Sequence, residues 1–130
     1  MTFSFTSPIT GGTIPAIPSK SAAHRMLICA ALADAPTKIL CADTNDDIDA
    51  TIDCLCALGA DITRTKQGFW VTPIAHAPAY AQMDARESGS TLRFLLPIVG
   101  ALGVDATFCM HGRLPQRPLS PLWKEMERMG

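Results

Sequence analysis

The sequence predicts an α/β protein, of the mixed α+β kind, in which helices cover one face of small sheets. Segments with helical spacing of apolar residues alternate with short runs typical of strands. The expected order is strand, helix, strand, helix, strand, strand, followed by helix, strand, helix, as if the same unit began again. In 130 residues, 48% hydrophobic and 18% charged side chains are enough for one globular core.

The first third of the chain predicts a strand–helix–strand order. Residues 3–17 alternate loosely and carry several glycines and prolines, so we expect two short extended pieces joined by a turn. Residues 21–33 place alanine, methionine and leucine at helical spacing and predict a helix, which ends before Pro36. Residues 37–41 predict a strand.

The next segment predicts a second helix and a hairpin. Either Asn45 or Asp46 can cap the helix N-terminus, and Gly59 suits its end. Residues 61–65 and 69–72 then predict two strands of a hairpin around a short turn.

The remaining residues predict two more helices. Residues 73–81 are rich in alanine and proline, and we interpret them as a linker between structural units. Residues 88–100 are apolar nearly all round and predict a buried helix. A strand is expected at 106–110, and a fourth helix from Pro118 or Pro121.

Charge and composition exclude several classes of function. The formal net charge of −1 argues against general attraction to nucleic acid or to a membrane surface, and leaves only local basic sites. No signal-peptide pattern opens the chain, and no apolar stretch is long enough to cross a bilayer. We therefore expect a cytoplasmic protein with no nucleic-acid or membrane partner.

Cysteine and histidine spacing does not predict a metal site or a disulfide framework. The cysteines form no C-x-x-C pair and are odd in number, so we expect small buried hydrophobes in a reducing compartment; they are Cys29, Cys41, Cys54, Cys56 and Cys109. The histidines show no ligand spacing, and we expect them at surface or capping positions; they are His24, His76 and His111.

The first candidate site lies at the start of the first helix. Lys20, Ser21 and Arg25 combine an ammonium, a hydroxyl and a planar guanidinium beside free backbone N–H groups. Ser21 and Arg25 are four residues apart and share a helix face, where Arg25 could bind a carboxylate with two hydrogen bonds. The alternative is a capped helix with solvated basic residues.

The second candidate site lies at the start of the third helix. Ser88, Gly89 and Ser90 are small, so a ligand can approach the backbone closely, with Glu87 just before them. The alternative is an ordinary serine N-cap. Arg93 lies one turn into an apolar helix, so it either pairs structurally, with Glu87 or an aspartate, or is directed at an anion, and we expect the structural role.

A third candidate is Arg117, which precedes Pro118. The residue before a proline is extended, so this side chain can project from the entrance of the fourth helix. The alternative is a loop arginine at the rim.

Taken together, these segments resemble the N-terminal part of the 5-enolpyruvylshikimate-3-phosphate synthase (EPSP synthase) family. Four stretches carry the resemblance in the same order and separation, over essentially the whole chain. They are residues 19–21 with 24–25, 45–47 with 58–60, 87–94, and 116–119.

The resemblance implies transfer of the enolpyruvyl group of phosphoenolpyruvate to the 5-hydroxyl of shikimate 3-phosphate, without metal or organic cofactor. By position, Lys20 resembles a lysine that touches both substrates. Ser21 and Arg25 resemble the pair that holds the shikimate carboxylate. Gly89 resembles a glycine against phosphoenolpyruvate, and Arg117 an arginine on its phosphate.

The family is longer, with two domains of three βαβαββ units each and a site in the cleft between them. The resemblance implies that residues 1–17 are opening strands of the other domain. Residues 18–130 would form part of the N-terminal domain, with one unit complete and a second truncated. The acid/base residues would lie outside this chain, so we expect no activity alone. We also expect association through the opening strand or with the missing C-terminal part.

Two alternatives remain from the sequence. One is a UDP-N-acetylglucosamine enolpyruvyl transferase, although that sister enzyme typically has Lys-Asn where this chain has Lys20-Ser21, and Cys109 is not well placed as its reactive cysteine. The other is a non-catalytic domain that binds a small anion or assembles with another polypeptide.

Overall fold

The computed structural model describes residue 4, residues 11–13 and residues 16–130, and the prediction of two extended pieces in residues 3–17 lies largely outside them. The described chain confirms the mixed helix and strand architecture. Its elements are α1 (Lys20–Ala31), β1 (Thr37–Leu40), α2 (Asp46–Ala57), β2 (Asp61–Thr65), β3 (Gly68–Thr72), β4 (Tyr80–Asp84), α3 (Gly89–Leu102), β5 (Asp105–Cys109), the short 3₁₀ helix η1 (Leu114–Gln116) and α4 (Leu122–Met129).

The strands form two small sheets. β3 lies between β1 and β2 and is antiparallel to both, in the order β1-β3-β2. β4 and β5 pair in parallel, with Tyr80 opposite Asp105 and Asp84 opposite Cys109. A parallel pair needs a crossover, and α3 supplies it. The prediction of repeated βαβαββ units stays a prediction.

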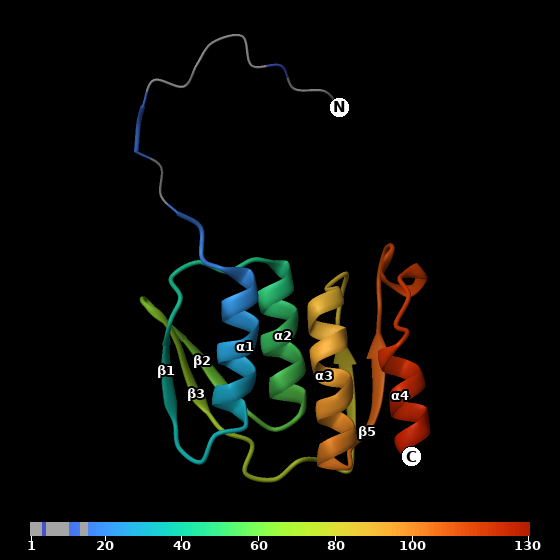
Figure 1. The fold of residues 1–130 in the computed structure, drawn as a ribbon. Helices are drawn as coiled ribbons and strands as arrows, with labels where there is room; N and C mark the ends of the chain where they lie inside the picture. The colour runs from blue at the N-terminus through green and yellow to red at the C-terminus, as the bar shows by residue number, and fades with distance from the viewer. Residues whose placement is uncertain (1–3, 5–10, 14–15) are drawn as a thin grey trace.

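The helices α1, α2 and α3 stand side by side in front of the strands, and they pack against one another and against the sheets (Figure 1). Their inward faces meet the sheets in one main core. Its fully buried large side chains include Leu27, Ile48, Leu55 and Val71. A smaller cluster of Ala85, Leu92, Leu96 and Leu114 lies under η1 and α4.

The prediction of a linker over residues 73–81 is wrong at its end, because β4 begins at Tyr80. Ala81 and Met83 point inward and are buried, while the alternate residues Tyr80, Gln82 and Asp84 are exposed. Alanine, glutamine and methionine have little preference for strands, so local composition did not reveal this one. Its pairing with β5, some two dozen residues later, stabilises it.

The helices place their N-termini at one end of the molecule. Lys20 begins α1, Asp46 begins α2 and Gly89 begins α3, and all three ends lie at the upper edge in Figure 1. Each helix N-terminus carries unpaired N–H groups and the positive end of the helix dipole. Three positive ends on one edge favour negative charge there.

Within the described residues, no helix combines the length and hydropathy that a membrane crossing needs.

Candidate functional site

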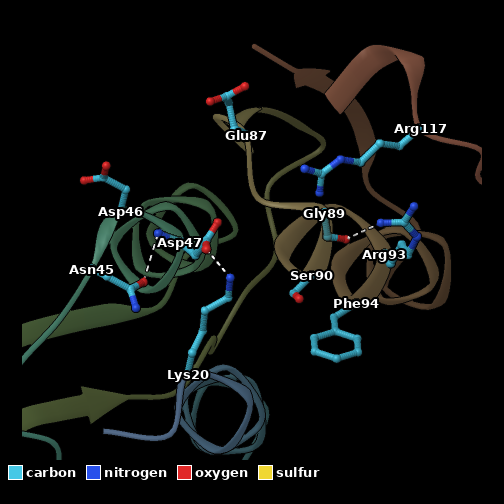
Figure 2. A pocket seen from close by; sticks show the side chains of 10 residues that line it. All are labelled: Lys20, Asn45, Asp46, Asp47, Glu87, Gly89, Ser90, Arg93, Phe94 and Arg117. Carbon is cyan, nitrogen blue, oxygen red and sulfur yellow. Dashed lines mark hydrogen bonds and ion pairs between the residues drawn. The ribbon is translucent and has the colours of Figure 1, made fainter. Parts of the chain in front are cut away.

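A hollow of about 680 Å³ opens at the edge where the three helices begin (Figure 2). It is lined by residues from segments far apart in the sequence, and half of them lie in the first turn of a helix. They are Lys20, Asn45, Asp46, Asp47, Glu87, Gly89, Ser90, Arg93, Phe94 and Arg117.

Side-chain caps fix the three helix ends around the hollow. The Ser19 hydroxyl accepts from the Ala22 N–H in α1. Asn45 caps α2, and its side-chain oxygen accepts from the N–H groups of Asp47 and Ile48 at 3.1 and 3.0 Å. Of the two caps considered from the sequence, Asn45 is therefore the one used. Ser88 caps α3 in the same way, and these caps set where each backbone end lies.

One wall of the hollow holds an ion pair between α1 and α2. The Lys20 ammonium donates to the Asp47 carboxylate, and both side chains are partly exposed (Figure 2). Burial acts to raise the pKa of Asp47, but the hydrogen bonds from Lys20 and Ser88 outweigh it and lower that pKa. Asp47 is therefore an ionised carboxylate that holds the Lys20 ammonium at the wall.

The opposite wall is the start of α3 with two arginines beside it. Arg93 Nη1 donates to the Gly89 carbonyl at 3.1 Å, and its Nη2 donates to the Pro118 carbonyl at 3.0 Å. A Cβ atom at Gly89 would lie only 2.6 Å from Arg93 Nη1 and 3.2 Å from Arg117 Nη1. The absence of a side chain at Gly89 therefore lets both guanidinium groups approach the helix start.

The expected structural role for Arg93 is present, but its partners differ from the prediction. Arg93 was expected to pair with Glu87 or an aspartate, and instead it donates to two backbone carbonyls. Glu87 does not pair with Arg93, and its Oε1 instead accepts from the Arg113 backbone N–H at 3.0 Å. A Cβ atom at Gly112 would overlap the Glu87 carboxylate, so the glycine makes room for this contact.

Ser21 and Arg25 lie beside the hollow and do not line it. Arg25 Nη1 donates to the Ser21 carbonyl at 2.9 Å and to its hydroxyl at 2.5 Å. The same guanidinium lies over the ring of Phe94, 4.9 Å from its centroid, and Phe94 lines the hollow. The structure therefore brings Lys20, Gly89, Ser90 and Arg117 to one hollow and places Arg25 behind its Phe94 wall.

Asp46 and Asp47 were not predicted as part of a site, although both line the hollow. In the sequence, residues 45–47 indicated only a helix cap and one of the matching motifs, and that motif was the signal that could have placed them here. The three cations of the lining are balanced by three carboxylates, Asp46, Asp47 and Glu87. The net charge of the lining therefore does not mark this hollow as an anion site. The helix N-termini and the side-chain N–H donors that face it do.

His24 corrects another prediction, since it is fully buried rather than at the surface or a cap. Its Nδ1 lies 2.7 Å from the Thr51 hydroxyl, and its ring meets Phe94 edge to face. Burial lowers the pKa of His24, and the nearby charges of Lys20 and Arg25 lower it further, although Asp47 raises it. His24 is therefore a neutral imidazole behind the hollow.

The cysteines are only partly as expected. Cys41 and Cys54 are buried, but Cys29 and Cys56 are exposed and Cys109 is intermediate, all as free thiols. Among the described residues, no three metal-binding side chains gather.

Comparisons with known proteins agree with the resemblance. A model of the EPSP synthase (3-phosphoshikimate 1-carboxyvinyltransferase) family matches residues 6–130. A 3-phosphoshikimate 1-carboxyvinyltransferase of Clostridium beijerinckii is 39% identical over 128 residues, which is 92% of this chain and 29% of that protein. One from Clostridioides difficile is 34% identical, over 90% of this chain and 29% of that protein.

A solved EPSP synthase from Acinetobacter baumannii has the same fold over 92% of this chain and 28% of that one, with a TM-score of 0.79 and 23% identity. The chain thus spans less than a third of the length of the relatives it matches. The family model covers nearly every residue, and the chain belongs to the EPSP synthase family.

Proposed function

We propose that the chain supplies one wall of a site that transfers the enolpyruvyl group of phosphoenolpyruvate to the 5-hydroxyl of shikimate 3-phosphate. In this reaction the 5-hydroxyl oxygen of shikimate 3-phosphate bonds to the carbon of phosphoenolpyruvate that carried the phosphate. The C–O bond between that carbon and the phosphate breaks, and inorganic phosphate leaves together with the hydroxyl proton. The curated relatives carry the name of this activity, 3-phosphoshikimate 1-carboxyvinyltransferase.

One observation carries the proposal. The hollow at the start of three helices is lined by Lys20, Gly89 and Arg117, which together span almost a hundred residues of sequence. Both substrates are anions, and a helix start with a lysine and an arginine beside it is suited to phosphate and carboxylate groups. The same donors would stabilise negative charge as phosphate leaves.

Each predicted contact has a role in this proposal. Arg117 would bind the phosphate of phosphoenolpyruvate above Gly89, where no side chain separates the ligand from the backbone. Lys20 would sit between the two substrates, with Asp47 holding its ammonium. Ser21 and Arg25 would hold the shikimate carboxylate together, and they already contact each other through hydroxyl and guanidinium.

Titration of the 130-residue chain with shikimate 3-phosphate tests the binding half of the proposal. We expect amide NMR signals at residues 20–25 and 88–93 to shift, and we expect Lys20→Ala and Arg25→Ala to weaken binding. Lys38→Ala is the matched control, because Lys38 is exposed and donates to Gln67 away from the hollow. Unchanged affinity in both site variants would remove the proposed contacts.

The same titration with UDP-N-acetylglucosamine tests the sister activity. Shifts at these residues with the UDP-sugar, and none with shikimate 3-phosphate, would replace the proposed substrate.

We further propose that the chain binds without turnover. In this proposal residues 18–130 form part of an N-terminal domain, residues 1–17 belong with the other domain, and the acid/base groups lie outside the 130 residues. A phosphate-release assay with both substrates is expected to show no turnover for the chain alone, and turnover when a complementary C-terminal polypeptide is added. Turnover by the chain alone would contradict this.

A further inference from the structure

A row of buried polar side chains crosses the three helices directly behind the hollow. His24 Nδ1 lies 2.7 Å from Thr51 Oγ1, Thr51 Oγ1 lies 2.7 Å from Thr91 Oγ1, and Thr91 Oγ1 lies 2.8 Å from Ser88 Oγ. All four residues are at most 2% exposed. The row therefore links α1, α2 and the cap of α3 with no access to solvent.

Counting protons gives this row a direction. A hydroxyl has one proton to donate, and Ser88 Oγ already accepts from both the backbone N–H and the hydroxyl of Thr91. The Ser88 proton is therefore free, and the Asp47 carboxylate, whose pKa Ser88 acts to lower, is its natural acceptor. An ionised carboxylate only accepts, so this end of the row is fixed.

The positions of the remaining protons follow from the Ser88 end of the row. Thr91 donates to Ser88, Thr51 donates to Thr91, and the only proton left for the first contact is the one on His24 Nδ1. The Asp47 carbonyl lies 3.3 Å from each threonine hydroxyl, farther than the links within the row. A Thr51 proton directed to that carbonyl would still leave His24 Nδ1 as the donor.

The other ring nitrogen is consistent with this assignment. His24 Nε2 is buried and has no hydrogen-bond partner among the described residues. The opposite tautomer would place a proton on this nitrogen, and a buried N–H without an acceptor is costly. It would also reverse every link in the row and direct a proton away from Asp47.

We propose that His24 is a positioning residue whose Nδ1–H begins a one-directional row through Thr51, Thr91 and Ser88 to Asp47, and so fixes the Lys20 ammonium at the hollow. Only the statement that Lys20 meets a substrate rests on the proposed function. The row holds the Asp47 carboxylate from the buried side, while Lys20 contacts it from the open side.

The tautomer of His24 tests the row without any ligand. Long-range ¹H–¹⁵N correlation of the ¹⁵N-histidine-labelled chain at neutral pH distinguishes a proton on Nδ1 from one on Nε2. We expect Nδ1–H for His24. His111 is an internal reference of the opposite kind, because its Nε2 lies 2.9 Å from an Asp84 carboxylate oxygen. A predominant Nε2–H form of His24 would overturn the proposal.

A pair of variants at Thr51 tests the link to Lys20. Thr51→Val keeps the shape but removes the hydroxyl, so we expect a mixture of His24 tautomers, a higher pKa of Asp47 and a roughly three- to ten-fold loss of shikimate 3-phosphate affinity. Thr51→Ser keeps the hydroxyl, and we expect it to behave as the parent chain in all three readouts.

Each outcome decides one statement. If Thr51→Val leaves both the tautomer and the Asp47 titration unchanged, the row does not exist as described. If both change while affinity does not, the row fails to position Lys20 for binding. If the parent chain does not bind shikimate 3-phosphate at all, the proposed function fails, and the tautomer and the Asp47 titration still test the row. If Thr51→Val does not fold, the parent tautomer and the Thr51→Ser chain supply the test.

Discussion

Gly89 shows how a single residue shapes the hollow. A methyl group at this position would lie 2.6 Å from Arg93 Nη1 and 3.2 Å from Arg117 Nη1. Both atoms are the far ends of flexible side chains, which can move without disturbing the core. The steric demand of a side chain here therefore falls on the two guanidinium groups.

We expect Gly89→Ala to fold with a small change in stability and to bind inorganic phosphate and phosphoenolpyruvate several-fold more weakly, because Arg117 must move. Gly100→Ala is the matched control in the same helix, since its Cβ would meet only Met126 Cε at 3.9 Å. Calorimetric titration of both variants measures the difference. Equal phosphate affinity in the two would show that the space above Gly89 is not a phosphate position.

Sequence motifs placed some residues of the site and missed others for a physical reason. Lys20 and Gly89 were predicted because each lies at a recognisable helix start, and Arg117 because the residue before a proline is extended, although α4 begins only at Leu122. The burial of His24 was not predicted, because it depends on Thr51 and Phe94, which come from two other helices. The predicted partners of Arg93 were wrong because its actual partners are backbone carbonyls, which leave no pattern in a sequence.

At the scale of elements, local sequence signals were sufficient to predict helices and a hairpin, but pairing between strands far apart in the sequence could not be predicted. The helices and the β2–β3 hairpin could be predicted from periodicity, caps and a turn glycine. β4 could not, because its pairing partner is β5 and its composition does not favour a strand. The hairpin glycine also has a role that its own turn does not reveal.

Gly68 begins β3 with φ +147°, and a Cβ atom there would lie 2.0 Å from the Ile39 carbonyl oxygen of β1. Gly103 ends α3 with φ +66° and has open space around it. We expect Gly103→Ala to lower the free energy of unfolding by about 1 kcal/mol, from backbone strain alone. We expect Gly68→Ala to lower it by roughly 3 kcal/mol or more, because two strands must also separate.

Urea denaturation followed by circular dichroism measures both variants. Equal losses of stability would show that the β1–β3 approach at Gly68 relaxes freely, and would contradict the close contact.

At the scale of the whole molecule, two buried or paired groups make stability depend on pH in the same direction. The pKa of His24 is lowered, so the unfolded chain binds its proton first as the pH falls below about 6.5. The pKa of Asp47 is also lowered, so the unfolded chain again binds more protons below about 3.9. In each window stability is lost as the pH falls toward the folded pKa.

We therefore expect the free energy of unfolding to fall in two steps on acidification, one near the histidine range and one near the aspartate range. His24→Gln should flatten the first step and Asp47→Asn the second. Lys20, Arg25 and Asp47 are the charges that act on His24, so Asp47→Asn should lower its folded pKa further, which extends the first step to lower pH and makes it larger. Urea titrations at pH values across both ranges test this, and parallel curves for all three chains would contradict it.

The chain spans under a third of its relatives, yet its main core joins three helices to both sheets, so we expect these residues to fold as one cooperative unit.

Cysteine reactivity measures this cooperativity directly. Burial raises the pKa of Cys54 to about 12, with Asp53 and Asp84 adding to the rise, and its thiol donates to the Asp84 carbonyl. Cys29 is exposed. A thiol reagent should therefore label Cys29 rapidly in native buffer and Cys54 only in proportion to global unfolding. Labelling of Cys54 should rise in urea at the midpoint seen by circular dichroism. Fast labelling of Cys54 in native buffer, with Cys29 as the reference in the same sample, would show that the main core does not form in the 130-residue chain.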